Sequence, residues 1–183
     1  MIYHFSLYAM GMTVGIALLV THIAALVLRR RLPAWLRQFP RSRPAGIALC
    51  TLAALWAFTL AATMDLGEFS PNRTMICSVI VLGAVIVPLW AEEFLAVRAL
   101  GILALLAAEP LLGAAFLRPE QTRLLVVILA YGWIVGGLFM VGAPYLLRDL
   151  IGWFCATRWR YLLAAWSGVA YGSLLIAVSL FCF

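Results

Sequence analysis

The sequence carries little charge and no lysine. Charged residues make up 11% of the 183, and all 13 basic residues are arginine, against 7 aspartate or glutamate residues. A soluble domain carries roughly 25% charged residues, so water is not the main solvent of this chain. Hydrophobic residues reach 66%, and the mean hydropathy is +1.08. This composition excludes an ordinary soluble domain and indicates a membrane protein.

Residues that perform chemistry are also scarce. The chain has 2 histidines and 4 cysteines, with no CxxC pair. It contains no HExxH, GxSxG, P-loop or dinucleotide-binding glycine motif, so no catalytic constellation emerges. We therefore expect a non-enzymatic protein without a metal site, and we interpret the cysteines as small apolar residues. The net charge of +6 lies mainly in short loops, which indicates lipid headgroups rather than nucleic acid as the partner.

Long apolar runs dominate the rest of the sequence. Several approach or exceed the roughly 20 residues needed to cross the hydrocarbon core of a membrane. In that core an α-helix satisfies all backbone hydrogen bonds within its own segment. The sequence predicts an all-α fold, a single polytopic membrane domain of about six helices with short loops. The expected spans are 5–28, 45–64, 74–90, 94–117, 124–147 and 161–182. Segments 29–44 and 148–160 mix arginine with aromatic residues and are expected to lie among lipid headgroups.

The arginines are unevenly distributed between the loops on the two sides of the membrane. With six spans, segments 29–44, 91–98 and 148–160 lie on one side and carry 10 arginines, while 65–73 and 118–123 carry 3. The positive-inside rule places the arginine-rich loops in the cytoplasm. Both termini are therefore expected on the non-cytoplasmic side of the membrane.

Glycines four residues apart recur in three of the expected spans. Such pairs let two membrane helices approach closely. The pairs are Gly11 with Gly15, Gly132 with Gly136, and Gly168 with Gly172. Together with the short loops, they favour a subunit or scaffold of a larger membrane assembly, bound to other membrane protein subunits or to itself.

Four ionisable residues lie in or beside apolar sequence in the middle of the chain: Glu92, Glu93, Arg98 and Glu109. A charge inside a membrane costs free energy unless it is paired or wetted, so such residues are candidates for an ion or proton site. The first three suit an interfacial turn. Glu109 lies deeper in its span and precedes Pro110, which removes a backbone donor. An alternative function is a small proton- or ion-coupled transporter that titrates Glu109, and the simpler alternative is a protonated Glu109 bonded to a neighbouring helix.

Both histidines lie in or beside the first span. His4 and His22 are 18 residues apart, about 27 Å along a helix, so one metal ion cannot bridge them. His22 can instead be one axial ligand of a haem or a pigment whose other ligand comes from elsewhere. This reading makes the protein an electron-transfer subunit. Because the chain supplies no further histidine, we favour a hydrogen-bonded His22 and no cofactor.

Overall fold

The computed structural model describes residues 5–90 and 93–182, and these ranges contain helices and no β-strand. The helices are α1 (Leu7–Val27), α2 (Leu32–Gln38), η1 (Phe39–Arg41), α3 (Arg43–Thr63), η2 (Gly67–Asn72), α4 (Arg73–Trp90), α5 (Leu95–Ala115), α6 (Arg123–Gly142), α7 (Tyr145–Ala156) and α8 (Arg158–Cys182). Within the described ranges, α1, α3, α4, α5, α6 and α8 are long and apolar enough to cross a membrane. The prediction of an all-α membrane fold is confirmed.

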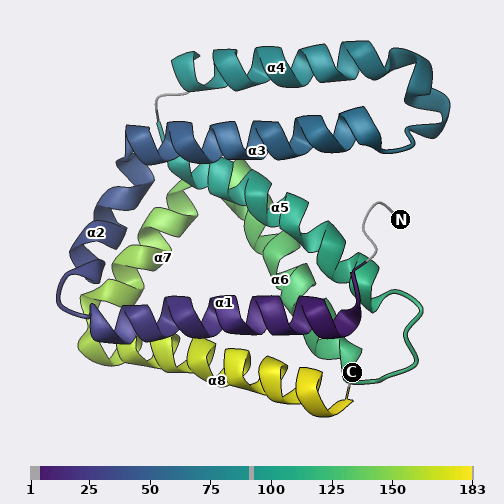
Figure 1. The fold of residues 1–183 in the computed structure, drawn as a ribbon. Helices are drawn as coiled ribbons and strands as arrows, with labels where there is room; N and C mark the ends of the chain where they lie inside the picture. The colour runs from purple at the N-terminus through teal and green to yellow at the C-terminus, as the bar shows by residue number, and fades with distance from the viewer. Residues whose placement is uncertain (1–4, 91–92, 183) are drawn as a thin grey trace.

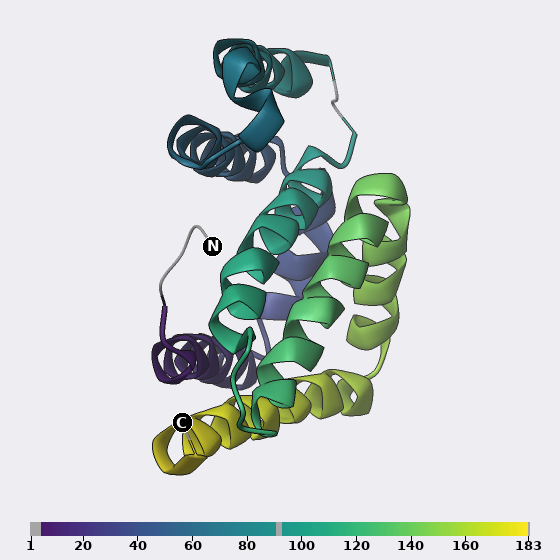
Figure 2. The same ribbon diagram turned by 90° about the vertical axis from the view of Figure 1, so that its right-hand side faces the viewer.

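The spans form three antiparallel pairs, α1 with α8, α3 with α4, and α5 with α6. In Figure 1 the α3/α4 and α1/α8 pairs lie on opposite sides, and α5 and α6 cross obliquely between them. Figure 2, turned by 90°, shows α4 on the far side of α3 from the rest of the fold. Helix α4 packs mainly against α3, and none of its residues is buried.

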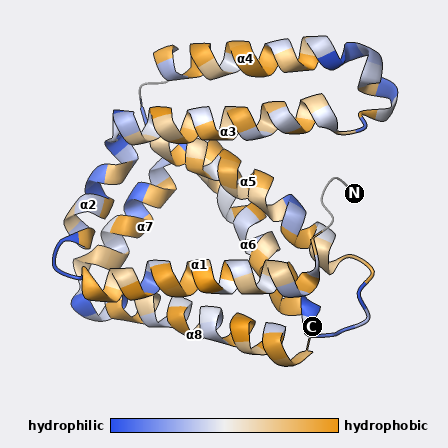
Figure 3. Ribbon diagram, in the orientation of Figure 1, coloured by the Kyte–Doolittle hydropathy of each residue, from blue (hydrophilic) through white to orange (hydrophobic). Residues whose placement is uncertain are grey.

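The short helix α2 and the helix α7 lie side by side at one end of the spans (Figure 1). Figure 3 shows hydrophilic residues at this end and in the connecting loops, and hydrophobic residues along the spans. Helix α1 begins and α8 ends at the opposite end (Figure 1). The two arginine-rich segments therefore share one end of the molecule, and its assignment to the cytoplasmic side stays a prediction.

One helix boundary departs from the expected spans, and one turn forms without a glycine. The fifth expected span reached residue 147, but α6 ends at Gly142 and α7 begins at Tyr145. Ala143 has φ −134° and ψ 66°, because a residue before proline is disfavoured in the helical region and Pro144 follows it. Helix α5 begins after Phe94, whose φ of 57° is left-handed and reverses the chain. A glycine was not needed at this turn.

Arginine side chains bridge the α3/α4 and α5/α6 hairpins at the connections between their helices. The guanidinium group of Arg73, the first residue of α4, donates to the carbonyl oxygens of Ala62 at 3.0 Å and Met64 at 2.7 Å. Arg123, the first residue of α6, donates to the carbonyl oxygen of Ala115 at 3.1 Å. The last carbonyls of a helix lack partners within the helix and carry its negative dipole end. Each arginine therefore caps the preceding helix.

Glycines set the closest helix approaches. Gly15 of α1 faces Gly172 of α8, and Gly101 of α5 faces Gly137 of α6. A Cβ added to Gly101 would lie 2.8 Å from the Gly137 carbonyl oxygen, so the two backbones touch there. Beside these crossings lies a core of buried residues from α1, α5, α6 and α8: Leu7, Ala108, Leu111, Ala115, Val126, Ala130 and Leu175. This core joins four of the helices that are long and apolar enough to cross a membrane.

Candidate functional site

Glu109 lies in α5, six residues before its end at Ala115, which is about 9 Å along the helix axis. Its side chain enters a shallow cavity of about 360 Å³ whose other walls are apolar, including Leu105, Phe116 and Ile134. Its Oε2 atom is buried and accepts no hydrogen bond from the described residues. A buried polar atom without a partner costs free energy. The cavity can therefore hold a neutral carboxyl group or a cation beside a carboxylate.

The other ionisable candidates lie far from Glu109. Arg98 is exposed near the start of α5, about 16 Å along the helix from Glu109. Glu93 is exposed in the preceding turn and shares a cavity of about 350 Å³ with Arg41 and Arg148. Glu92 lies outside the described residues. The three candidates that the structure describes, Glu93, Arg98 and Glu109, therefore do not form one polar site.

His22 packs between α1 and α8. Its Nδ1 atom lies 2.8 Å from the Leu18 carbonyl oxygen, which can only accept, so Nδ1 donates. The Cδ2–Nε2 edge of the ring lies against the backbone of Gly168, where a Cβ atom would overlap the imidazole. Nε2, the atom left to ligate iron, therefore faces α8. The arrangement does not fit a haem plane at His22, and the described residues hold no group of three metal-ligating side chains.

The predicted glycine pairs fall into two kinds. On α1, Gly11 and Gly15 are buried, and on α8, Gly172 is buried and Gly168 holds the His22 ring. On α6, a Cβ added to Gly132 would meet nothing within 4 Å, and one added to Gly136 would meet only Met140 of the same helix. The expected packing role of Gly132 and Gly136 stays a prediction, because no other element in the described ranges covers this pair.

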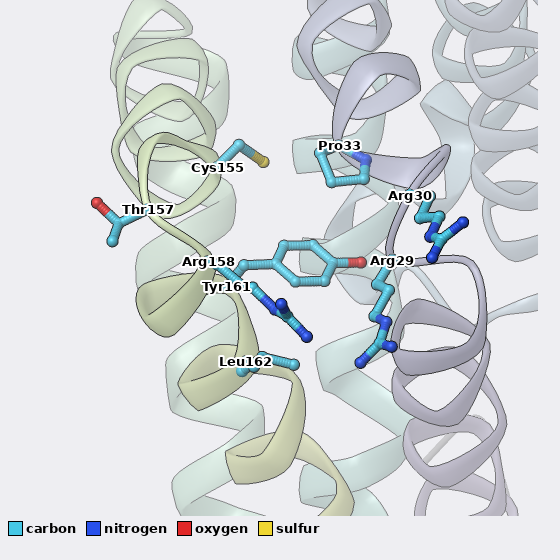
Figure 4. A pocket seen from close by; sticks show the side chains of 8 residues that line it. All are labelled: Arg29, Arg30, Pro33, Cys155, Thr157, Arg158, Tyr161 and Leu162. Atoms are coloured by element: carbon cyan, nitrogen blue, oxygen red, sulfur yellow. The ribbon is translucent and has the colours of Figure 1, made fainter.

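A cavity lined by three arginines lies where α1 and α2 meet α7 and α8. It measures about 360 Å³ and is lined by Arg29, Arg30, Pro33, Cys155, Thr157, Arg158, Tyr161 and Leu162, which we call the arginine cavity. Figure 4 shows the guanidinium groups of Arg29 and Arg158 extending toward each other beside the Tyr161 ring. Among the residues that the structure describes, no acidic side chain lines it. The cavity can bind an anion.

Two hydrogen bonds fasten the walls of the arginine cavity. The Tyr161 hydroxyl group of α8 donates to the Ala25 carbonyl oxygen of α1 at 2.8 Å. Arg37 of α2 donates from Nη2 to the Cys155 carbonyl oxygen of α7 at 2.7 Å. Both bonds join segments more than 100 residues apart in the chain. The two bonds therefore hold together the helices beside Arg29 and Arg158, whose own side chains are exposed.

No protein-family model, curated protein or solved structure matches this chain. Its function is therefore inferred from the geometry.

Sequence reasoning grouped Arg29 with one interfacial segment and Arg158 with another, but it did not bring them together. The missing step was the pairing of the first and last spans. Helix α1 ends just before Arg29 and α8 begins at Arg158, so any antiparallel α1/α8 pair places the two residues at one level. Gly101 was missed for another reason: the residues four positions away, Val97 and Leu105, are large, so no pair of small residues marks it as a contact of Gly137.

Proposed function

We propose that the protein is a non-catalytic integral membrane subunit of a larger membrane assembly, and that α6 binds a transmembrane helix of a partner subunit. One observation carries the proposal. The Gly132–Gly136 pair of α6 is open on the outside of the fold, whereas Gly15 of α1 contacts Gly172 of α8 and Gly168 of α8 contacts the His22 ring. A glycine row on a membrane helix lets another backbone approach closely, and here the described residues supply none.

The open pair belongs to a continuous exposed face. Ile128, Gly132, Val135, Gly136 and Phe139 recur at helical spacing on one side of α6, and we call them the glycine face. Its apolar members are 62%, 52% and 57% exposed for Ile128, Val135 and Phe139. Gly137 lies on the opposite side of the helix and contacts α5. Helix α6 is therefore packed on one side and presents glycine, β-branched and aromatic residues on the other.

The partner's chemistry follows from how this chain pairs its other glycines. Gly15 meets Gly172 and Gly101 meets Gly137, glycine against glycine in both cases. A transmembrane helix with small residues at i and i+4 is the matching occupant for the glycine face. Lipid tails are as apolar as the helix surfaces, so the hydrophobic effect does not drive two helices together in a membrane. Van der Waals packing at such close approach does.

Site-specific photocrosslinking in the native host tests this proposal. A photoreactive amino acid at Ile128 or Val135 is expected to give one discrete adduct with a second membrane protein. Val79 and Ile86 of α4 are the matched controls, because their side chains are 61% and 50% exposed, and they are expected to label lipid. The same protein adducts from both helices, or none from α6, would contradict the proposal.

A second candidate function is favoured by Glu109. Its buried, unpartnered Oε2 atom in an apolar cavity is the kind of intramembrane carboxyl that binds a proton or a cation. Glu109→Gln keeps the shape and removes the titration. A proton-coupled transporter would lose pH-dependent flux in vesicles while keeping its fold and partners. An accessory subunit keeps its assembly, and the assembly keeps its activity.

A further inference from the structure

The arginine cavity concentrates positive charge that the described residues do not neutralise. Arg29, Arg30 and Arg158 form no ion pair there. The nearest acidic residue along the chain, Asp149 of α7, is held by Arg148 at 2.7 Å. Like charges brought together repel each other, and the repulsion is stronger near a membrane than in bulk water. The fold therefore holds Arg29 and Arg158 in an arrangement that an anion stabilises.

A backbone contribution adds to the side chains. Arg158 is the first residue of α8, a helix of 25 residues, and Thr157 before it is extended. The first N–H groups of a helix have no partner within the helix and carry its positive dipole end. Such a terminus favours a phosphate or another anion. Thr157 and Arg158, the residues at this helix end, line the cavity together with Arg29.

The cavity lies at the depth of lipid headgroups. It sits at the end of the spanning helix α1 and the start of the spanning helix α8. Trp159, which follows Arg158, is 66% exposed, and Trp153 of α7 is 52% exposed. Exposed tryptophans of this kind mark the membrane–water interface. Pro33 and Leu162 add apolar surface to the cavity wall, which suits the glycerol end of a lipid.

We propose that the arginine cavity binds a phosphate group, with Arg29 and Arg158 as its main ligands. The planar guanidinium group donates two parallel hydrogen bonds to phosphate oxygens, which a lysine ammonium group does not. Arg30 extends away from the other two in Figure 4 and contributes charge rather than a direct bond. The position at the interface makes an anionic phospholipid the expected source of the phosphate. This site does not depend on the partner proposed for α6.

The test is lipid retention by native mass spectrometry. The full chain is released from nanodiscs of phosphatidylcholine that contain a minor fraction of phosphatidylglycerol. The wild type is expected to keep one phosphatidylglycerol molecule, and Arg29→Gln with Arg158→Gln is expected to lower this retention at least about tenfold. Arg31→Gln with Arg43→Gln removes the same charge from the same end outside the cavity and is expected to retain the lipid.

Two further measurements distinguish bound phospholipid from free phosphate, and loss of the site from loss of the fold. Arg29→Lys with Arg158→Lys keeps the charge, and it is expected to retain less lipid than the wild type but more than the glutamine pair. Inorganic phosphate is titrated into delipidated protein while thermal unfolding is followed. If phosphate stabilises the wild type but not the variant with Arg29→Gln and Arg158→Gln, and no phospholipid is retained, the site stands with free phosphate as its ligand. Equal behaviour of the wild type and both glutamine pairs in both assays would overturn the proposal.

Discussion

Gly15 of α1 and Gly172 of α8 touch backbone to backbone. A Cβ added to Gly172 would lie 2.9 Å from the Gly15 carbonyl oxygen, and one added to Gly15 would lie 3.1 Å from the Gly172 carbonyl oxygen. Because backbone atoms on both sides limit any adjustment, even a methyl group forces the helices apart. The contact joins the first and last spans and therefore closes the chain into one unit.

The first prediction is that Gly172→Ala lowers the free energy of unfolding by about 1–3 kcal/mol, the usual cost of overpacking. Gly83→Ala in α4 is the control, since a Cβ there meets nothing within 4 Å. The control is expected to be neutral or to stabilise by up to about 1 kcal/mol through helix propensity. Unfolding in bicelles measures both. Equal effects of the two substitutions would mean that α1 and α8 do not meet at these glycines.

The second prediction concerns His22 and Gly168, which occupy one space between α1 and α8. Gly168→Ala is expected to destabilise the wild type by about 1–3 kcal/mol, because the ring has to move and its bond to the Leu18 carbonyl oxygen is lost. In a His22→Ala background the same change should cost little. A double-mutant cycle measures this coupling, expected at about 0.5–3 kcal/mol. An unchanged cost in both backgrounds would refute the packing role of His22.

The third prediction concerns the cap on α3. Arg73→Ala removes two hydrogen bonds, to Ala62 and Met64, and is expected to cost about 2 kcal/mol of unfolding free energy. Arg73→Lys keeps the charge and should lose about half as much. Arg118→Ala is the control, because Arg118 is an exposed residue of the loop between α5 and α6. A similar loss from Arg118→Ala would point to charge alone rather than to the cap.

The fourth prediction concerns the thiol of Cys155 in α7, outside the spanning helices. Burial raises the pKa of this thiol, and the positive charge of Arg37 partly opposes the rise. A raised pKa means less thiolate at a given pH. In a variant with Cys155 as its single cysteine, the midpoint of the alkylation rate against pH is expected above the ordinary value of about 8.5. Arg37→Ala should move this midpoint higher, and a downward movement would contradict the assigned cause.

The spanning helices were predictable because the thickness and apolar interior of the bilayer determine their length and composition. Each apolar run had to satisfy its backbone within itself, so its identity as a helix followed without knowledge of its neighbours. The turn at Phe94 was placed within a residue or two for the same reason, since Glu92, Glu93 and Arg98 had to remain near the interface. The boundary between α6 and α7 was harder, because the apolar run continues past Pro144.

Pairing between helices was less predictable than the helices themselves. The four-residue spacing of Gly11 and Gly15, and of Gly168 and Gly172, indicated close packing. No local pattern, however, indicated that the first span packs against the last. The same gap hid the arginine cavity, because Arg29 and Arg158 are separated by most of the chain. Glu109 was found from its chemistry alone, and its distance from Arg98 along α5 followed once the helix register was known.

The central claim is that the protein is a subunit whose glycine face binds a different membrane protein. Native mass spectrometry on protein extracted in mild detergent from its own host tests it most directly. The account predicts that a defined second protein travels with the wild type and with Gly83→Leu, and that Gly136→Leu loses it while keeping its fold. A bare monomer or an oligomer of this chain alone would contradict the account.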